Sequence, residues 1–457
     1  MEIKTKRGLN IPIKGEPTGK VQTLSANGKD ISPKLIALNL DPFEELRFKL
    51  HAKDGDVVKK GQPLAEDKLV EGRMFVAPAA GVIKEVRRGL KRRLIDIVIE
   101  VSDKEDELTH PQLNPQSSSK EDLKKRLMEG GAFAHIRQRP FNLLADPHKE
   151  PRDIFIQAIN TSPFAVPSEF HIEGLENEFQ AGIDTLAKLT SGKVHLVYPY
   201  NSNCKAFTDA KNCEKHTAEG PHPAGNPSVH IHNIAPIQKV EDIVWTLTAR
   251  DVALVGALVT EGKYLTDRVI SIAGPGILPG QTGYFKVREG MPIESLIAGR
   301  IGKEPTRFIS GSVLTGSKVE AEDFLGFYDD AFCAVPESTA RELLHFFRLG
   351  IDKYSASKAY LSGHLSGDKK YNFTTSQHGE TRGFIIASPY DNVMPMNIPT
   401  MLLVKAVMAE DFELAEELGF LEVASEDFAL ATFVCPSKIE MVDIMKNGAN
   451  SYAQEVY

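Results

Sequence analysis

The chain contains 457 residues, more than one compact core usually holds, and this length favours three or four domains. Hydrophobic residues make up 42% and charged residues 25%, so the composition supplies packed cores and excludes global disorder. The net charge of -8 argues against a dedicated nucleic-acid-binding protein, which would carry a basic face.

The sequence predicts a protein without a membrane span of its own. Residues 1–8 are charged and lack the apolar core of a secretory signal, and the longest apolar stretch, residues 252–259, is too short to cross a bilayer. The four cysteines are too sparse for a disulfide framework and suit a reducing cytoplasm: Cys204, Cys213, Cys333 and Cys435.

The first predicted domain spans residues 1–105. Between residues 46 and 101, short β-rich runs alternate with glycine-containing turns, a pattern that resembles the biotinyl/lipoyl-type half-barrel. Glu66-Asp67-Lys68 is similar to the carrier motif around a lipoylated lysine, but residues 70–75 lengthen the hairpin that would present it. We expect an unmodified barrel, with a carrier domain modified on Lys68 as the alternative.

A basic segment, residues 87–93, stands out on this acidic chain. It contains the charged residues Arg87, Arg88, Lys91, Arg92 and Arg93. We predict a solvated hairpin tip. The functional alternative is docking to an acidic partner or to anionic lipid headgroups, to which each basic residue contributes about 1 kcal/mol.

The second predicted domain, residues 106–262, is a Rossmann-like α/β layer. It begins with a polar, proline-containing linker at residues 111–119. The apolar run at residues 153–159 is typical of a buried parallel strand, helical spacing follows at residues 179–189, and another strand is expected at residues 194–198.

The start of this domain carries the remnant of a phosphate-binding loop. Ser118 and Glu121 fit a capping box that opens a helix over residues 122–128, and Gly130-Gly131 ends it. A flavin or dinucleotide site needs a glycine-rich turn, and only the glycine pair is present before bulky residues. We therefore predict a degenerate flavin loop, although Arg137 and Arg139 could still bind an anionic group or a partner.

The densest histidine cluster comprises His222, His230 and His232. If the last two lie in a strand, they point to one face and could chelate a metal or stand beside a proton-accepting ligand. The upstream residues Cys204, Cys213 and His216 raise a zinc hypothesis, but no Cys-x-x-Cys pair is present. We predict a structural histidine cluster and no metal.

The third predicted domain, residues 263–335, consists of short strands and turns. Residues 269–276 and 287–296 resemble the soluble-ligand-binding β-grasp, or SLBB, domain. The run Gly311-Ser312-Val313-Leu314-Thr315-Gly316-Ser317-Lys318 has the glycine spacing of a P-loop, but serine precedes lysine and both functional groups would be misplaced. We expect an ordinary turn there.

The fourth predicted domain, residues 336–457, is helical. Leu343, Leu344, Phe346 and Phe347 are expected on one helical stripe, and Pro399-Thr400 is expected to open a helix that runs to Ala409. A shorter helix at residues 412–418 ends at Gly419.

Cys435-Pro436 near the C-terminus reads like the last ligand of an iron–sulfur segment. A 4Fe–4S cluster is usually held by four thiolates, and residues 425–431 contain no cysteine. We therefore predict that Cys435 is a packed, structural cysteine in a degenerate ferredoxin-like tail.

The order of these regions resembles the flavoprotein subunit of respiratory complex I and the C subunit of Rnf complexes, and most closely the A subunits of sodium-translocating NADH:quinone reductases. Residues 6–13, residues 220–225 with His230 and His232, and residues 390–396 carry the resemblance. The C-terminal segments at residues 418–422 and 433–438 add to it.

The resemblance implies a peripheral subunit on the cytoplasmic face of a bacterial inner membrane, with five partner subunits that include a membrane subunit. Such a complex oxidises NADH, reduces ubiquinone and exports Na⁺. It also implies that this chain binds no flavin, iron–sulfur cluster or metal, uses no NADH itself, and is inactive alone.

Whether ubiquinone touches this chain stays open. The candidate contacts are His222, His230 and His232 as proton-handling groups, or Arg137 and Arg139 as anion-tolerant groups. The main alternative function is a self-contained NADH:flavin oxidoreductase. A carrier modified on Lys68 and a free-standing ligand-binding β-grasp module are further alternatives.

Overall fold

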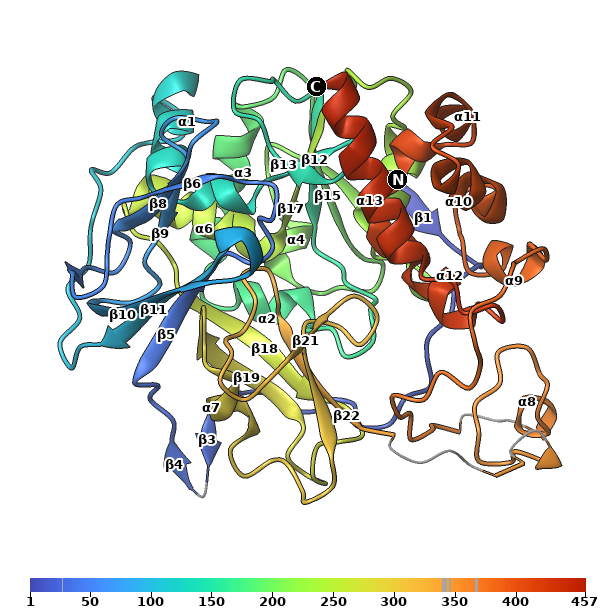
Figure 1. Ribbon diagram of the computed structural model, residues 1–457. Helices are drawn as coiled ribbons and strands as arrows, with labels where there is room; N and C mark the ends of the chain where they lie inside the picture. The colour runs from blue at the N-terminus through green and yellow to red at the C-terminus, as the bar shows by residue number, and fades with distance from the viewer. Residues whose placement is uncertain (27, 339–342, 345–346, 366–368) are drawn as a thin grey trace.

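The computed structural model describes residues 1–26, 28–338, 343–344, 347–365 and 369–457. Figure 1 shows four regions in chain order: a barrel in blue, an α/β layer from cyan to yellow-green, a mixed β-sheet in yellow and a helical region in red. No helix among the described residues combines the length and the apolar character needed to cross a membrane.

The barrel consists of two small antiparallel sheets around one apolar core. Their strand orders are β5-β11-β10-β7 and β6-β8-β9. Leu64, Phe75 and Ile97 are buried in the shared core, and Lys68 lies exposed in the turn after β8. The strands are β5 (Leu35–Asn39), β6 (Phe48–Leu50), β7 (Val57–Val58), β8 (Pro63–Asp67), β9 (Met74–Val76), β10 (Gly81–Arg88) and β11 (Leu94–Val101).

The first strands of the chain join other sheets. β1 (Glu2–Lys4) pairs in parallel with β16 (Glu214–Glu219) of the α/β layer, and β2 (Val21–Thr23) pairs in parallel with β19 (Gly283–Arg288) of the mixed sheet. β3 (Ser25–Ala26) and β4 (Lys29–Asp30) form a separate hairpin. The N-terminal segment thus connects two sheets, whereas the predicted first domain, residues 1–105, grouped it with the barrel.

A seven-stranded sheet forms the centre of the α/β layer, in the order β1-β16-β15-β14-β17-β12-β13. Strands β16, β15, β14 and β17 are parallel, and β12 and β13 complete the sheet in antiparallel fashion. The strands predicted at residues 153–159 and 194–198 are confirmed. The bounds are β12 (Arg137–Arg139), β13 (Leu143–Leu144), β14 (Asp153–Gln157), β15 (Val194–Pro199) and β17 (Val244–Thr248).

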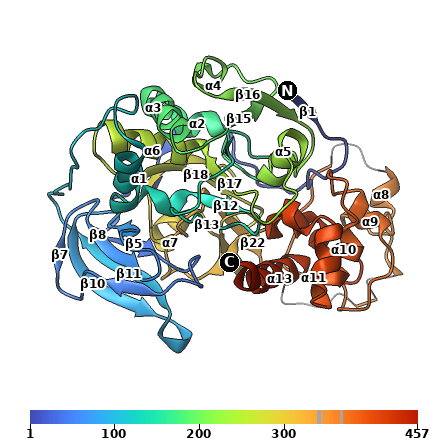
Figure 2. The ribbon, with the colours of Figure 1, turned by 90° about the horizontal axis from the view of Figure 1, so that it is seen from above.

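Helices cover both faces of this sheet (Figure 2). On one face α1, α3 and α6 bury Leu123, Ile183 and Leu254 against the strands, and on the other face α5 and the C-terminal helices share a second core. A Cβ on Gly256 would lie 1.7 Å from the Glu178 carbonyl oxygen, so α3 and α6 pack too closely for a larger residue. The helices are α1 (Lys120–Glu129), α2 (Ser168–Ile172), α3 (Glu176–Ala187), α4 (Lys205–Thr208), α5 (Pro227–Ile234) and α6 (Ala249–Thr260).

The cap of α1 differs from the prediction by one residue. Ser119 is the N-cap, because its Oγ accepts a hydrogen bond from the backbone N–H of Asp122 at 3.1 Å. The predicted capping box on Ser118 and Glu121 is therefore wrong. The predicted end of the helix at Gly130 is confirmed.

The mixed sheet has the order β2-β19-β18-β22-β20-β21. Its core contains Ile270, Phe332 and Leu296, the last from the short helix α7 (Ile293–Ile297). Residues 311–316 join β20 to β21 as an antiparallel hairpin, which confirms the ordinary turn predicted there. The remaining strands are β18 (Asp267–Ala273), β20 (Thr306–Ser310), β21 (Ser317–Val319) and β22 (Ala331–Pro336).

The helix predicted directly after Pro336 falls largely outside the described residues, which omit 339–342 and 345–346. Among the described residues that follow, the short α8 (Ser362–Leu365) precedes the longer C-terminal helices. Leu343 and Leu344 lie in a turn, and Phe346 of the predicted stripe is outside the described residues. The later elements are α9 (Ser388–Asp391), α10 (Thr400–Met408), α11 (Phe412–Glu417), α12 (Ala429–Val434) and α13 (Met441–Val456).

Cys435 lies in the core of this helical region. Its thiol is fully buried, 3.1 Å from the Tyr390 hydroxyl, and its Sγ accepts a hydrogen bond from the Ile439 backbone at 3.4 Å. The prediction of a packed cysteine is confirmed, as are the helices predicted near residues 400–409 and 412–418.

Candidate functional site

A cavity of about 400 Å³ opens at the carboxyl ends of the central parallel strands. Strands β15 and β16 extend the sheet on one side of β14, whereas β17 lies on its other side. Open α/β sheets bind ligands at such a change of direction, outside the carboxyl ends of the strands. Gln157 ends β14, Thr248 ends β17, and both line the cavity, so the topology places the candidate site here.

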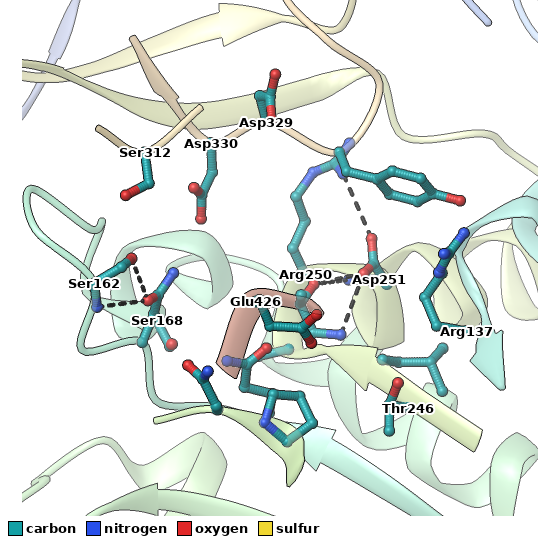
Figure 3. A pocket seen from close by; sticks show the side chains of 18 of the residues that line it. Arg137, Ser162, Ser168, Thr246, Arg250, Asp251, Ser312, Asp329, Asp330 and Glu426 are labelled. Carbon is teal, nitrogen blue, oxygen red and sulfur yellow. Dashed lines mark hydrogen bonds and ion pairs between the residues drawn. The ribbon is translucent and has the colours of Figure 1, made fainter. Parts of the chain in front are cut away.

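All four regions of the chain contribute to the cavity wall. Figure 3 shows Asp329, Asp330 and Ser312 from the mixed sheet facing residues of the α/β layer. The barrel region adds Pro42, and the C-terminal region adds Glu426. The α/β layer supplies Arg137, Arg139, Asn142, Gln157, Ser162, Ser168, His171, His222, Thr246, Thr248, Arg250 and Asp251.

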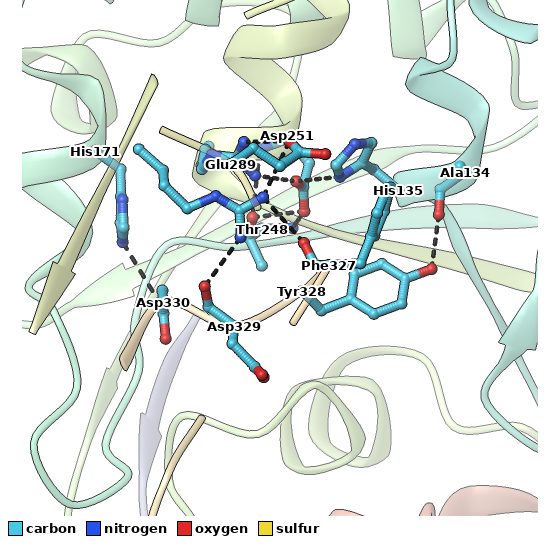
Figure 4. A network of polar contacts seen from close by, with 12 residues as sticks. Ala134, His135, His171, Thr248, Asp251, Glu289, Phe327, Tyr328, Asp329 and Asp330 are labelled. Carbon is cyan, nitrogen blue, oxygen red and sulfur yellow. Dashed lines mark hydrogen bonds and ion pairs between the residues drawn. The ribbon is translucent and has the colours of Figure 1, made fainter. Parts of the chain in front are cut away.

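The start of α6 anchors a buried polar network (Figure 4). Thr248 caps the helix: its backbone N–H donates to Asp251 Oδ2 at 3.2 Å, and its Oγ accepts from the Asp251 backbone at 3.3 Å. The other carboxylate oxygen of Asp251 lies 3.0 Å from His135 Nδ1. The capping box therefore fixes the carboxylate that faces His135.

A second carboxylate, Glu289, extends the network toward the mixed sheet. It lies 3.0 Å from Arg268 Nη2 and 3.3 Å from Arg250 Nη2. The Tyr264 hydroxyl, which lies 2.9 Å from His135 Nε2, donates to Glu289 at 3.3 Å. Since Arg268 and Glu289 are buried, their charges are compensated by each other rather than by water.

Asp251 carries a fixed negative charge. Burial opposes its ionisation, but the hydrogen bond from His135 and the charges of His135 and Arg250 outweigh burial and hold its pKa well below the usual range. Asp251 is thus suited to orienting its neighbours and not to exchanging protons near neutral pH.

Arg139 joins the α/β sheet to the C-terminal region. Its Nη1 donates to Ser228 Oγ at 2.9 Å and its Nη2 to Glu426 at 2.5 Å. Its buried Nε has no hydrogen-bond partner among the described residues. The neighbouring Arg137 donates to the Asn142 carbonyl and stacks over the Tyr328 ring, 5.4 Å from the centroid.

Two aspartates of the mixed sheet bring acidic groups to the opposite wall. Burial raises the pKa of Asp329, whose carboxylate accepts a hydrogen bond from the Ser310 hydroxyl at 2.6 Å. Asp330 Oδ2 lies 3.6 Å from His171 Nε2. The cavity therefore offers both guanidinium donors and a carboxyl group whose pKa is raised by burial.

The predicted histidine cluster does not form one site. His222 lines the cavity, with its Nδ1 3.2 Å from Thr161 Oγ1. His230 is buried with its Nε2 3.0 Å from the Ala224 carbonyl oxygen, and His232 Nδ1 lies 2.7 Å from Glu422 Oε2.

The expectation that His230 and His232 share a strand face is wrong. Pro227 begins α5, as is common at the first helical position, and residues two apart on a helix point in different directions. The structure therefore brings three of the five predicted residues to the cavity: Arg137, Arg139 and His222.

The electrostatics of these rings separate them further. Burial lowers the pKa of His222 and of His230 to about 4, so both rings are neutral near pH 7. The hydrogen bond to Glu422 raises the pKa of His232. His232, the histidine whose pKa is raised, therefore lies outside the cavity.

The glycine pair expected to be a remnant of a phosphate loop fills a packing role. A Cβ on Gly130 would lie 2.5 Å from a Leu258 methyl group, and one on Gly131 would lie 2.8 Å from a Val76 methyl group. The loop is thus pressed between α6 and the barrel. The absence of a flavin stays a prediction.

The zinc hypothesis on Cys204, Cys213 and His216 is wrong in its ligand set. Among the described residues, the group of His, Cys, Asp or Glu side chains whose ligand atoms converge is His195, Glu214 and His216. Burial raises the pKa of Cys204, and it raises that of Cys213 to about 11, which keeps both thiols protonated.

Several cavity residues were not predicted from the sequence. Thr248 and Asp251 follow the spacing of a helix cap, a signal that could have located the start of α6. Glu426 gave no signal, because its partner Arg139 is 287 residues away in the chain. Long-range pairs of this kind emerge only from the fold.

Three family models match successive parts of the chain. The NqrA N-terminal barrel-sandwich hybrid domain matches residues 3–102, and the NqrA second alpha/beta domain matches residues 118–264. The NQRA C-terminal domain, a model of the SLBB type, matches residues 269–321.

Curated relatives are similar over the full length of the chain. The A subunit of the Na⁺-translocating NADH-quinone reductase of Chlamydia pneumoniae is 37% identical, over 100% of this chain and 98% of the relative. The A subunit of the same reductase from Vibrio parahaemolyticus is 35% identical, over 99% of this chain and 100% of the relative. A solved NAD⁺-reducing NiFe-hydrogenase in the H2-reduced state is 12% identical, over 75% of this chain and 62% of that chain, with a TM-score of 0.38.

Proposed function

Because the chain belongs to the family of Na⁺-translocating NADH-quinone reductase A subunits, we propose that it is a peripheral subunit of such a complex, on the cytoplasmic face of a bacterial inner membrane. The complex oxidises NADH, reduces ubiquinone and exports Na⁺. The chain works with five partner subunits, binds no flavin or iron–sulfur cluster, and is inactive alone.

The observation that carries this proposal is the length of the similarity. The two relatives are matched over 98% and 100% of their own length, so the similarity includes the C-terminal helical region beyond the last family model. The test is purification of the tagged chain from its native membrane. Recovery together with the other subunits of an NADH-quinone reductase is expected, and recovery without any of them would contradict the proposal.

Two exposed features are suited to docking. At the turn between β10 and β11, the side chains of Arg88, Lys91 and Arg92 are exposed and Leu90 is 87% exposed. In the C-terminal region, apolar side chains are exposed at Leu349, Ile351, Leu365, Ile385 and Ile386. Exposed apolar side chains that gather in one region commonly mark a protein or membrane contact, and we assign these to contact with the membrane subunit.

The cavity is the candidate contact for the quinone head group. Its guanidinium groups can donate hydrogen bonds to the two quinone carbonyl oxygens, and the neutral His222 can do the same. Ile159, Val166 and Leu247 supply apolar wall for the ring. Binding at Arg137, Arg139 and His222 is therefore the favoured arrangement.

Photo-crosslinking with a quinone analogue in the intact complex tests this contact. Label is expected on the elements that line the cavity, and Arg139→Gln is expected to reduce it several-fold. Arg307→Gln is the matched control, because Arg307 also pairs with a glutamate, Glu337, but lies away from the cavity. Label confined to membrane subunits would exclude a quinone site on this chain.

The visible spectrum separates the proposed subunit from a self-contained NADH:flavin oxidoreductase. The purified chain is expected to lack flavin and iron–sulfur absorption and to leave NADH unoxidised. A stoichiometric flavin with NADH oxidation by the chain alone would favour the alternative. An intact mass that shows an adduct on Lys68 would instead indicate a carrier domain.

A further inference from the structure

A group of three side chains lies at the amino ends of the parallel strands, whereas the cavity lies at their carboxyl ends. The three residues are His195, Glu214 and His216. None of them lines the cavity or takes part in its polar network. His195 is the second residue of β15, and Glu214 is the first residue of β16. The cavity and its polar network therefore do not account for this group of side chains.

The register of the two strands brings the three side chains to one face. In the parallel pair, His195 lies opposite Glu214, and Val197 lies opposite His216. Since side chains alternate along a strand, Glu214 and His216 point to the same side of β16. The Glu-x-His spacing together with a histidine on the next strand is therefore a geometric consequence of the sequence.

The ligand atoms are close enough to share one cation. His195 Nδ1 lies 3.0 Å from His216 Nε2 and 3.8 Å from Glu214 Oε2. One ligand atom from each residue lies within 4.8 Å of the other two. A tetrahedral zinc ion bound at about 2.0–2.1 Å to two nitrogens would separate them by about 3.3 Å, so an outward shift of a few tenths of an ångström suffices.

The surroundings hold the rings in place. His195 stacks on Phe155 at 4.6 Å, and its Nε2 lies 3.6 Å from Asp153 Oδ1. A carboxylate behind a ligating histidine fixes the ring orientation and raises its basicity. His216 Nδ1 lies 3.2 Å from the Met1 amino nitrogen, and Nε2 is the ring nitrogen that faces His195.

Access to the group comes from the side of Glu214. Both imidazoles are buried, whereas the Glu214 side chain is 44% exposed and pairs with the exposed Lys193 through its other oxygen. One carboxylate oxygen is thus directed at the rings while the side chain reaches solvent. A cation can enter there and keep a water molecule as its fourth ligand.

We propose that His195, Glu214 and His216 bind one divalent transition-metal cation of the zinc class and thereby hold β15 to β16. Two imidazole nitrogens and one carboxylate oxygen suit Zn²⁺ and Co²⁺ and disfavour Mg²⁺ and Ca²⁺, which prefer all-oxygen ligand sets. The site is separate from electron transfer and stabilises the fold.

Zinc titration of the metal-free full-length chain tests the proposal. Calorimetry is expected to show one equivalent of Zn²⁺ bound, and thermal unfolding is expected to shift upward with Zn²⁺ concentration. Glu214→Gln is expected to weaken binding by at least about tenfold, since even partners behind the ligands affect metal affinity by that factor. His148→Gln, in an exposed turn, is the matched control and should bind like the parent chain.

Glu214→Gln changes a half-exposed side chain, so it is expected to fold even where a change at a buried histidine does not. Equal zinc affinity in the parent chain and in Glu214→Gln would overturn the proposal, as would the absence of binding. In the latter case the two rings form only a hydrogen bond with each other.

Cobalt serves as a spectroscopic probe of the ligands. The Co²⁺-loaded chain is expected to show the visible bands of a four-coordinate nitrogen and oxygen site, and Cys213→Ser should leave them unchanged. Thiolate charge-transfer absorption that disappears in Cys213→Ser would assign the cation to cysteine and would also overturn the proposal.

Discussion

The amino ends and the carboxyl ends of the central parallel strands differ in how their polar side chains are paired. At the carboxyl ends of the strands, Asp251 pairs with Arg250 and Glu289 pairs with Arg268, and the network links the α/β layer to the mixed sheet. At the amino ends, two imidazole nitrogens and one carboxylate oxygen converge on one point. Charges compensated within the protein build a rigid wall at one end, whereas the proposed cation site at the other end depends on side chains whose ligand atoms converge.

Asp251→Asn is expected to destabilise the polar network at the carboxyl ends of the strands. It removes a buried charge beside His135 and Arg250, so His135 loses its carboxylate partner and Arg250 keeps only Glu289. Loss of one member of a buried pair costs about 3–5 kcal/mol, so the free energy of unfolding should fall by about 3 kcal/mol in a denaturant titration.

Asp443→Asn is the control for this change, because Asp443 is an exposed aspartate in the first turn of α13. Its free energy of unfolding should remain within about 0.5 kcal/mol of the parent. If the free energy of unfolding of Asp251→Asn falls by less than about 1 kcal/mol, the network does not stabilise this end of the sheet.

Glu426→Gln is expected to weaken the contact between the C-terminal region and the carboxyl ends of the strands. The buried Arg139 loses its charged acceptor, and a hydrogen bond between charged groups contributes about 1.5–3 kcal/mol. We expect a loss of about 2 kcal/mol in unfolding free energy and faster proteolysis between the α/β layer and α12. Glu337→Gln, which removes the negative charge beside the half-exposed Arg307, should cost less than about 1 kcal/mol. Equal losses in the two variants would show that burial of the arginine does not matter.

The contact between His232 and Glu422 makes the stability of the fold depend on pH. Glu422 raises the pKa of His232 in the folded state, so the pair stabilises the protein fully below the unfolded pKa of about 6.5, and this contribution disappears as pH rises through the raised value. His232→Gln should therefore lower the unfolding free energy by about 1 kcal/mol at acidic pH and by much less at alkaline pH.

Denaturant titrations at several pH values measure this effect, and His148→Gln, exposed and distant in sequence, should show no such dependence. A penalty for His232→Gln that stays constant with pH would mean that the contact acts through packing alone.

The basic hairpin tip belongs to the barrel, and its charged side chains lie at neither end of the central strands. Replacing Arg88, Lys91 and Arg92 together by glutamine should change the unfolding free energy by less than about 0.5 kcal/mol, because these side chains are exposed. Association with anionic vesicles or with the complex should weaken, and the difference should vanish at high salt. Unchanged association at low salt would assign the tip to solvent alone.

The sequence predicted elements whose signals are local. Continuous apolar runs located β14 and β15, the inverted Ser317-Lys318 excluded a P-loop, and the absence of other cysteines near Cys435 predicted its packing. Each of these conclusions depends on neighbours within one short segment. Local propensity and spacing are sufficient there.

The remainder depends on contacts between distant segments. His230 and His232 read equally well as strand or helix until Pro227 is placed at a helix start. The ring of His222 reaches the cavity because its loop follows β16, and Arg139 gains Glu426 only when the turn before α12 packs near the sheet. Neither periodicity nor spacing encodes which segments meet across several hundred residues.

The pairing of β1 with β16 has a consequence for synthesis. The two strands are separated by more than 200 residues, so the first strand leaves the ribosome long before its partner exists. At about 5–20 residues per second, the wait is on the order of 10 to 40 seconds. Until then one edge of the α/β sheet cannot be closed, and open strand edges invite pairing with other chains. β1 can therefore join this sheet only after a partner strand more than 200 residues later has been made.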